Sequence, residues 1–393
     1  MRNFIKPILT YLHHHLVLTL LSQNKEKELQ APINLLGRFD EVRSAIFSPD
    51  GTKILTVSFD KTASLWDLIG KTRAIFKGHT DWVNSAIFSP DGTKVLTSSW
   101  DQTARLWDLN GITLAIFMGH TVDVGSAVFS PDGTKILTSS LDETARLWDL
   151  DGKKLAIFKG HGRITEAIFS PDGTKVLTVS TDFTAQLWDL NGNTIATFID
   201  HTDVVWSAIF SPDGTKILTS SLDNTARLWD LNGNTIATFI EHTDVVWSAI
   251  FSPDGKKVLT SSGDQTARLW DLSGQTLAIF MGHSERVNSA LFSPDGTKIL
   301  TSSWDKTARL WDLNGQTIAI FNGYTVYVKS AVFSPDGTKV LIAFTDNTLR
   351  IWKLPENSWK LKLYTSLFVL YRIVVTIALK FRAITAKLKM LFS

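Results

Sequence analysis

The five-residue stretch Phe-Ser-Pro-Asp-Gly, first found at Phe47–Gly51, decides the fold, because it occurs eight times in a chain of 393 residues. The last copy is Phe333–Gly337. Proline presets φ for the first corner of a turn, aspartate suits the second, and glycine accepts the positive φ that returns the chain as a hairpin. An internal repeat overrides the two or three domains that chain length alone suggests. The sequence therefore predicts eight hairpins.

One complete repeat, residues 79–119, shows what surrounds each hairpin. Four short apolar or β-branched segments are separated by turn residues, and no helical period of 3.6 residues runs through them. The pattern predicts four antiparallel strands, at residues 83–88, 94–99, 103–107 and 113–117. A single sheet of this size cannot bury both faces, so the copies must pack against one another.

The spacing of the repeats leads to a family. Each of the first seven copies ends in a Trp-Asp pair, and successive tryptophans lie 40 or 41 residues apart. With Gly78-His79 before a copy and Trp107-Asp108 near its end, the chain resembles the WD-repeat β-propellers. The near-identical copies are similar to those of prokaryotic members. The resemblance implies an all-β fold, an eight-bladed β-propeller of four-stranded antiparallel blades.

Three parts of the chain are expected. Residues 1–30 are an apolar N-terminal extension, residues 31–354 the propeller, and residues 355–393 a basic, apolar C-terminal tail. Residues 8–21 look like the apolar core of a signal peptide, but three histidines interrupt them and no clear cleavage site follows. We therefore expect a cytoplasmic protein. The absence of cysteine suits a reducing compartment and excludes disulfides and a cysteine nucleophile.

Ring closure depends on the two chain ends. In the family, the last blade is often completed by a strand from the other end of the chain. Residues 32–37 align with residues 73–78, which places Ile33 and Leu35 at the positions of Ala74 and Phe76. We expect this N-terminal segment to complete the eighth blade, with residues 359–363 as the rival.

A histidine, a hydroxyl, an aspartate and a tryptophan recur together in most copies. The resemblance implies that they form a buried, hydrogen-bonded tetrad that is structural. The same residue types make a hydrolase triad, but an active site is seldom present six times over. We predict no catalytic residue, no metal, no cofactor and no enzymatic activity. In the second copy the tetrad residues are His79, Thr97 or Ser99 (Ser99 being our first choice), Asp101 and Trp107.

Two copies depart from this pattern. The first has Arg38 at the histidine position, and the last has Tyr324 there and Lys353 after its tryptophan. Neither can build the full tetrad, so we expect the ring to be weakest where its ends meet.

Function is expected where the copies differ. In WD propellers, the residue before the aspartate that follows strand two and the two residues flanking the first apolar residue of strand one lie on one rim of the central channel. Of 14 tryptophans, eight are the repeat's own, Trp359 is in the tail, and the other five fall at these positions. Aromatic residues and arginine are enriched at the centres of interfaces, although some of these side chains could instead pack on neighbouring loops. The candidate partner-binding residues are Phe59, Trp82, Asn84, Trp100, Arg163, Trp206, Trp247, Arg286, Trp304, Tyr327 and Lys329.

Charge separates the ends from the body. Residues 1–30 carry +2 and residues 355–393 carry +6, so the residues between them carry −6 of the total of +2. Phosphate contacts need a positive surface, so we expect no nucleic-acid partner. The basic tail contains the apolar residues 363–379, interrupted by Arg372, which favours contact with a membrane surface over crossing. A helix that docks on another protein fits the tail about as well.

These observations predict a monomeric, non-catalytic scaffold that binds a peptide or protein partner on an aromatic and basic rim. The alternative is an adaptor tethered to a membrane surface through the C-terminal tail.

Overall fold

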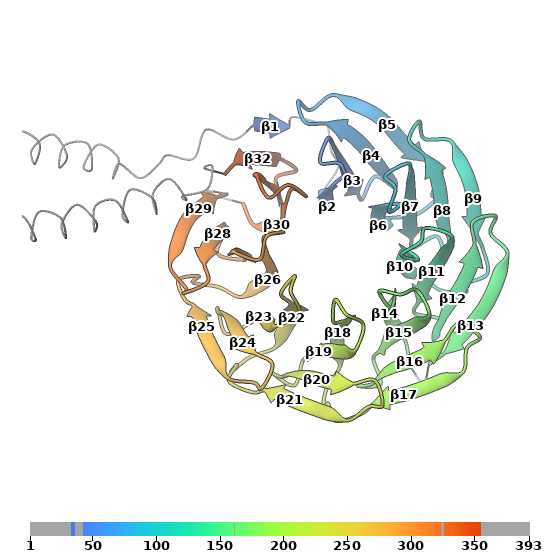
Figure 1. The fold of residues 1–393 in the computed structure, drawn as a ribbon. Coiled ribbons are helices and arrows are strands. Elements are labelled where there is room, and N and C mark those ends of the chain that lie inside the picture. Colours follow the sequence, from blue (N-terminus) through green and yellow to red (C-terminus); the bar gives the residue numbers. More distant parts are fainter. Residues whose placement is uncertain (1–32, 36–41, 161, 324–325, 355–393) are drawn as a thin grey trace, which may run out of the picture. The chain divides into compact units, whose positions relative to one another are not determined.

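The computed structural model describes residues 33–35, 42–160, 162–323 and 326–354. Within them, 32 strands form eight four-stranded antiparallel sheets, arranged as the blades of a ring (Figure 1). The described residues contain no helix. Residues 30–353 form one compact unit. The predicted fold class, an eight-bladed β-propeller, is confirmed. The N-terminal extension and the C-terminal tail lie outside the described residues.

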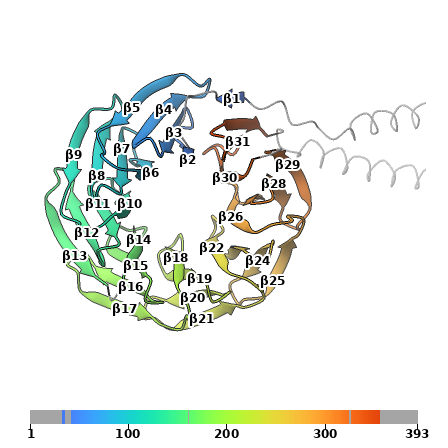
Figure 2. The ribbon, with the colours of Figure 1, turned by 180° about the vertical axis from the view of Figure 1, so that it is seen from behind.

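Each of the first seven blades uses four consecutive strands, and the first strand of each blade lies nearest the centre (Figure 2). Blade 1 contains β2 (Val42–Phe47), β3 (Lys53–Ser58), β4 (Thr62–Asp67) and β5 (Thr72–Lys77). Blade 2 contains β6 (Val83–Phe88), β7 (Lys94–Ser99), β8 (Ala104–Asp108) and β9 (Thr113–Phe117). Blade 3 contains β10 (Val124–Phe129), β11 (Lys135–Ser140), β12 (Thr144–Asp149) and β13 (Lys154–Lys159). Blade 4 contains β14 (Ile164–Phe169), β15 (Lys175–Ser180), β16 (Ala185–Asp189) and β17 (Thr194–Phe198).

The remaining blades complete the ring. Blade 5 contains β18 (Val205–Phe210), β19 (Lys216–Ser221), β20 (Ala226–Asp230) and β21 (Thr235–Phe239). Blade 6 contains β22 (Val246–Phe251), β23 (Lys257–Ser262), β24 (Ala267–Asp271) and β25 (Thr276–Phe280). Blade 7 contains β26 (Val287–Phe292), β27 (Lys298–Ser303), β28 (Thr307–Asp312) and β29 (Thr317–Asn322). Blade 8 contains β30 (Val328–Phe333), β31 (Lys339–Phe344), β32 (Leu349–Lys353) and, from the other end of the chain, β1 (Ile33–Leu35).

The turns have the expected chemistry. In the second copy of the repeated stretch, Gly92 has a φ of 69° and donates its N–H to the carbonyl oxygen of Ser89 at 2.8 Å. The Ser89 hydroxyl accepts the N–H of Lys94, which holds the two ends of the hairpin together. In the turn between β8 and β9, the Asp108 carboxylate accepts the N–H groups of Asn110 and Ile112. The aspartate of Trp-Asp is therefore a turn cap.

The N-terminal segment completes blade 8, as predicted. Strand β1 pairs antiparallel with β32, and Ile33 lies opposite Ile351 while Leu35 lies opposite Leu349. This is the register in which β5 pairs with β4 in blade 1. The rival segment, residues 359–363, lies outside the described residues. We call the contact between blades 8 and 1 the seam.

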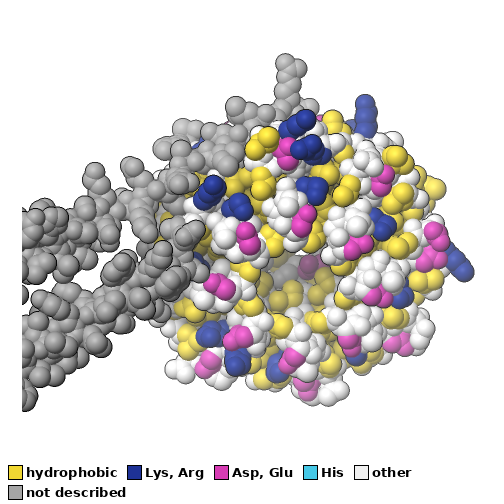
Figure 3. Space-filling view, turned by 45° about the horizontal axis from the view of Figure 1, so that its top comes forward, with side chains coloured by type: hydrophobic (Ala, Val, Ile, Leu, Met, Phe, Trp, Pro, Cys, Tyr) yellow, Lys and Arg dark blue, Asp and Glu magenta, His cyan; other side chains and the backbone are white. Residues whose placement is uncertain are grey.

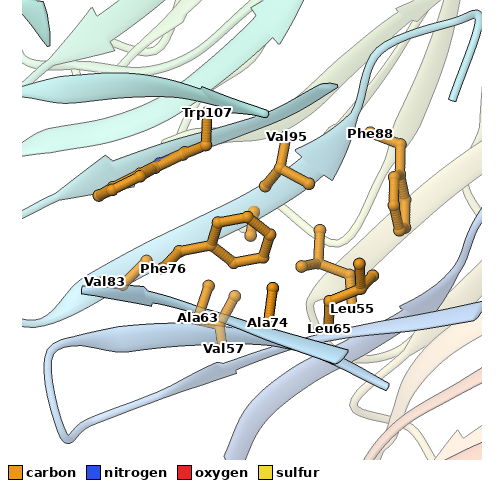
Figure 4. Close-up of a cluster of buried hydrophobic side chains, with 11 residues drawn as sticks. Leu55, Val57, Ala63, Leu65, Ala74, Phe76, Val83, Phe88, Val95 and Trp107 are labelled. Atoms are coloured by element: carbon orange, nitrogen blue, oxygen red, sulfur yellow. The ribbon is translucent and has the colours of Figure 1, made fainter. Parts of the chain in front are cut away.

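Core side chains lie between blades. Leu55, Leu65 and Phe76 of blade 1 pack against Val83 and other residues of blade 2, including Trp107 (Figure 4). Six further clusters repeat this arrangement around the ring. Burial of apolar surface against the next blade therefore provides the main stabilisation of each sheet.

The repeated prolines form a second ring of contacts between the blades. At each of the eight turns, a Cβ added to the glycine would lie 3.4 to 3.6 Å from the proline of the preceding blade. Gly51 of blade 1 lies beside Pro335 of blade 8 in the same way. The ring is therefore closed at this end by the same contact that joins every other pair of blades.

Candidate functional site

The tetrad of blade 2 is a closed network of hydrogen bonds. His79 Nδ1 lies 2.7 Å from an Asp101 carboxylate oxygen, and His79 Nε2 lies 2.7 Å from the Thr97 hydroxyl. Trp107 donates its indole N–H to the same hydroxyl at 2.9 Å. The network ties the loop after blade 1 to strands β7 and β8 of blade 2.

The hydroxyl of the tetrad is that of Thr97, so our first choice, Ser99, was wrong. The Ser99 hydroxyl donates to the carbonyl oxygen of Asp81 and accepts the N–H of Asp101, which shapes the turn beside the tetrad. Equivalent His-Asp and His-Thr contacts are present in blades 3, 5, 6 and 7, with the histidines His120, His201, His242 and His283. Arg38, His161 and Tyr324 lie outside the described residues.

Burial and charge make this network unsuited to catalysis. Burial acts to raise the pKa of Asp101, but hydrogen bonds from His79 and Thr103 outweigh it and hold that pKa below its usual range. In blade 3, burial lowers the pKa of the His120 imidazole, although its contact with Asp142 acts to raise it. The Thr97 residue is fully buried. A substrate has no access to this hydroxyl, so the tetrad satisfies buried polar groups.

Backbone geometry brings the variable positions together at the end of the ring opposite the proline turns. The N–H of Trp100, in the β7–β8 turn, donates to the carbonyl oxygen of Trp82, just before β6, at 2.9 Å. The same bond joins Trp304 to Arg286 in blade 7 and Thr345 to Tyr327 in blade 8. In blades 2 to 8, two variable side chains of one blade therefore begin from adjacent backbone.

A β-bulge supplies the third variable position. In every blade the register of strands one and two shifts after the first residue, and the residue that is skipped is variable. Bulges redirect a side chain away from the regular alternation of a strand. The skipped residues with aromatic or basic side chains are Arg43, Trp206, Trp247 and Lys329.

Seven aromatic side chains on this rim fall into two contact chains, which we call together the aromatic rim. The first chain runs over blades 1 and 2: the rings of Phe59 and Trp82 are 4.7 Å apart, and those of Trp82 and Trp100 are 4.8 Å apart. The cationic groups of Arg43 and Lys329 lie 5.9 and 5.8 Å from the Phe59 ring. The first chain therefore reaches across the seam to blade 8.

The second chain runs over blades 5 to 8. The ring centroids of Trp206 and Trp247 are 5.4 Å apart, and those of Trp304 and Tyr327 are 5.9 Å apart. Arg286 joins the two pairs, because its guanidinium lies 5.3 Å from the Trp247 ring and 3.2 Å from the Trp304 ring. The two chains meet at blade 8, where Tyr327 and Lys329 flank the first residue of β30.

Two predicted residues do not join these chains. The Asn84 side chain donates a hydrogen bond to the carbonyl oxygen of Gly125, so it links blades 2 and 3. Arg163 is exposed in blade 4 and contacts no aromatic ring of the described residues.

One contributor was missed. Lys306 lies 5.5 Å from the Tyr327 ring. It follows the aspartate of its turn, a position held by Lys61, Gln102 and Glu143 in the first three copies and always at positive φ. Variation between copies at this fourth position was a signal that could have revealed it.

The surface on one side of the ring carries mixed charge. Figure 3 shows acidic and basic side chains interspersed around a central hollow that hydrophobic side chains line. Among the described residues, no three His, Asp or Glu side chains form a group suited to a metal ion. The described part of the chain also has no helix that is long and apolar enough to cross a bilayer.

Known structures share this fold. The crystal structure of the computationally designed Ika8 protein is similar with a TM-score of 0.74 and 22% identity, over 82% of this chain and 100% of that chain. The C-terminal WD40 domain of Sif2 is similar with a TM-score of 0.75 and 20% identity, over 83% of this chain and 99% of that chain. At these identities the likeness concerns the fold alone. No curated protein matches the chain.

Family models match most of the propeller. The model of the IFT122 first beta-propeller matches residues 41–281, which is more than half of the chain. The model of the WD domain, G-beta repeat, matches residues 274–312 and 315–353. The resemblance to prokaryotic members stays a prediction. Together with the eight blades and the repeated Trp-Asp pairs, these matches show that the chain belongs to the WD-repeat family of β-propellers.

Proposed function

We propose that this protein is a non-catalytic scaffold. It binds a peptide or protein partner on the aromatic rim and on the basic residues that contact the rim's rings, Arg43, Arg286 and Lys329. Members of the WD-repeat family generally serve as interaction scaffolds. The observation that supports this site is the pair of contact chains, which together cover blades 5 to 8, 1 and 2.

The tryptophans of the aromatic rim are more exposed to solvent than the tryptophans of the Trp-Asp pairs. Trp107 and Trp229 are fully buried, whereas Trp206 is 50% exposed and Trp304 is 46% exposed. Large apolar side chains that gather on a surface usually mark an interaction site. Tryptophan and arginine are the residues most often found at the energetic centre of an interface.

The shape of the contact chains favours an extended partner. The aromatic side chains follow the rim over six blades and do not converge on one point. Blades 3 and 4 contribute no ring contact on this rim among the described residues. A partner segment that lies along the aromatic rim would contact several blades at once.

Affinity capture followed by mass spectrometry identifies the partner, and binding is then measured with Trp100→Ala, Trp206→Ala and Trp304→Ala proteins. Each substitution of a central residue is expected to cost about 2 kcal/mol or more of binding free energy with unchanged melting. The matched control is Ile112→Ala, because Ile112 is 62% exposed in a turn at the opposite end of the blade. Full affinity in all three tryptophan variants contradicts the proposal.

A second candidate function is suggested by the tail, where residues 355–393 hold seven Lys or Arg against one Glu. An adaptor tethered to an anionic membrane surface needs such a segment. Flotation with phosphatidylserine vesicles, comparing the full chain with a chain ending at Leu354, separates the two functions. Loss of flotation in the shorter chain, together with full partner binding by the tryptophan variants, favours the tail.

A further inference from the structure

A hollow of about 390 Å³ opens on the rim where blades 7, 8 and 1 meet. Trp304 and Tyr327 form an aromatic wall, and Arg43 and Lys329 bring two cationic groups from opposite sides of the seam. Asn288 and Thr345 add polar groups to the lining. We call this hollow the seam pocket.

The described lining of the pocket is positively charged. None of the described residues that line it is acidic. Arg43 forms no ion pair with a described residue, and burial lowers the pKa of its guanidinium, which shows that the charge is partly desolvated. An incoming anion would accept charge-assisted hydrogen bonds from this partly desolvated guanidinium.

A third cation, Arg286, contacts the Trp304 ring that lines the pocket. The Arg286 guanidinium is stacked on Trp304, and its Nε is buried without a hydrogen-bond partner among the described residues. Arg286 makes no ion pair with the described part of the chain either. Its charge therefore adds to the positive potential at the pocket.

The same stacking argues against a cationic ligand. A methylated lysine or another ammonium group binds to open aromatic faces. Here Arg286 already covers Trp304 and lies close to Trp247, and Lys306 lies 5.5 Å from the Tyr327 ring. A cationic ligand would have to displace these side chains and would meet like charges at the pocket.

We propose that the seam pocket binds one anionic side chain, a carboxylate or a phosphate, of a peptide whose apolar neighbours lie on the aromatic rim to either side. This inference rests on the proposed function, because it names the chemistry of the partner at that site. The guanidinium of Arg43 suits both anions, since its planar N–H groups match the two oxygens of a carboxylate or a phosphate. The Trp82 and Trp304 rings, one on each side of the seam, suit the flanking apolar residues.

An array of 12-residue peptides tests the proposal with the full-length protein. The sequences are random but enriched in Trp, Phe and Leu, and four sets have Glu, phosphoserine, Gln or Lys fixed at the centre. We expect the Glu set, the phosphoserine set or both to bind at least tenfold tighter than the Gln set, and the Lys set to bind most weakly. The stronger of the two anionic sets identifies the source of the anion.

Two variants locate the effect. In the Arg43→Gln protein, the anionic peptide sets are expected to bind about as tightly as the Gln set. Arg163→Gln changes a rim cation of blade 4 and is expected to leave the tighter binding of the anionic sets intact. Equal binding of all four sets, no binding by any set, or an unchanged preference in Arg43→Gln overturns the inference. The proposed function is tested separately by partner capture with the tryptophan variants, so an intact tryptophan dependence with no anion preference removes this inference alone.

Discussion

The contact between blades 1 and 2 differs from the contact between blades 8 and 1. The outer strand of blade 1, β5, has six residues, and a buried polar network adds to its contact with blade 2. The outer strand of blade 8, β1, has three residues. The core between blades 1 and 2 contains Phe76 and Trp107, both fully buried. The core at the seam is built from Val42 and Trp66 of blade 1 with Leu341 and other apolar residues of blade 8. Both contacts bury apolar surface, but only the first adds a described His-Asp pair.

Blade 8 fills the tetrad positions in another way. Its second strand has Ile342, Ala343 and Phe344 where the second copy has Thr97, Ser98 and Ser99. Phe344 is fully buried and its ring lies 6.2 Å from that of Trp352. The same backbone therefore accepts either a hydrogen-bonded network or apolar packing.

The largest expected loss of stability follows from removing an aromatic ring from the core between blades 1 and 2. Phe76→Ala should reduce the free energy of unfolding by about 3 to 5 kcal/mol, because the cavity adds to the lost burial. Leu35 occupies the equivalent register position in β1, and Leu35→Ala should cost less. Urea unfolding of both variants measures the difference. An equal cost at both sites would show that the seam is as strong as the other contacts.

Removing one carboxylate tests the network itself. Asp101→Ala should cost about 1 to 3 kcal/mol, because it leaves buried donors on His79 and the neighbouring loop without an acceptor. The matched change in blade 8 is Asp346→Ala, where the exposed carboxylate lies 3.8 Å from Arg350, and surface pairs of this kind contribute little. Thermal unfolding measures both. A folded Asp101→Ala protein of unchanged stability contradicts the structural role of the tetrad.

A titrating group at the contact between blades 4 and 5 is expected to make stability depend on pH. Glu166 replaces the serine of other copies and lies opposite Val179. Burial raises the pKa of its carboxyl group to about 7, although the N–H of Ala208 in blade 5 acts to lower it. A raised carboxyl pKa favours folding most below the ordinary value of 4.5, and this contribution is lost as the pH rises through about 7.

Urea unfolding at pH 5 and pH 7 measures this effect. The wild-type protein should lose at most about 2 kcal/mol more stability than Glu166→Gln over that interval. The variant is the control, because all other titrating groups are common to both proteins. Identical pH dependence in the two proteins would mean that Glu166 does not titrate in this range.

The smallest global effect is expected from the closing strand. Deleting residues 31–37 should lower the free energy of unfolding by about 1 kcal/mol, since only a few strand hydrogen bonds are lost. Amide exchange should already be faster in blade 8 than in blades 2 to 7, and the deletion should accelerate it further. If instead removal of residues 355–363 has these effects and the deletion has none, β1 is not the strand that stabilises blade 8.

The repeat allowed most of the fold to be predicted from the sequence, because each turn and strand is specified eight times. Three of the four strands expected in the second copy have the predicted bounds, and the third both begins and ends one residue later, at Ala104–Asp108. The choice between Thr97 and Ser99 could not be made, since residues two apart on a strand share a face and both carry a hydroxyl. Only the position of the histidine loop decides between them.

The candidate site was harder to predict. Aligning the copies found the variable positions, but not the order in which their side chains touch. The stacking of Arg286 between Trp247 and Trp304 joins two blades and depends on the direction in which each side chain leaves its backbone. Lys306 stands at a fourth variable position, in the turn after the aspartate, outside the three positions that the family resemblance places on the rim.

The position of the seam pocket couples recognition to ring closure. A ligand held by Arg43 from one side and by Tyr327 and Lys329 from the other binds only when blades 1 and 8 are together. Such a ligand stabilises the closed ring by RT ln(1 + [L]/Kd), about 2.7 kcal/mol at a hundredfold excess over Kd. By thermodynamic linkage, a change in β1 weakens binding to the extent that it populates an open ring. The chain end thereby becomes a control element for affinity.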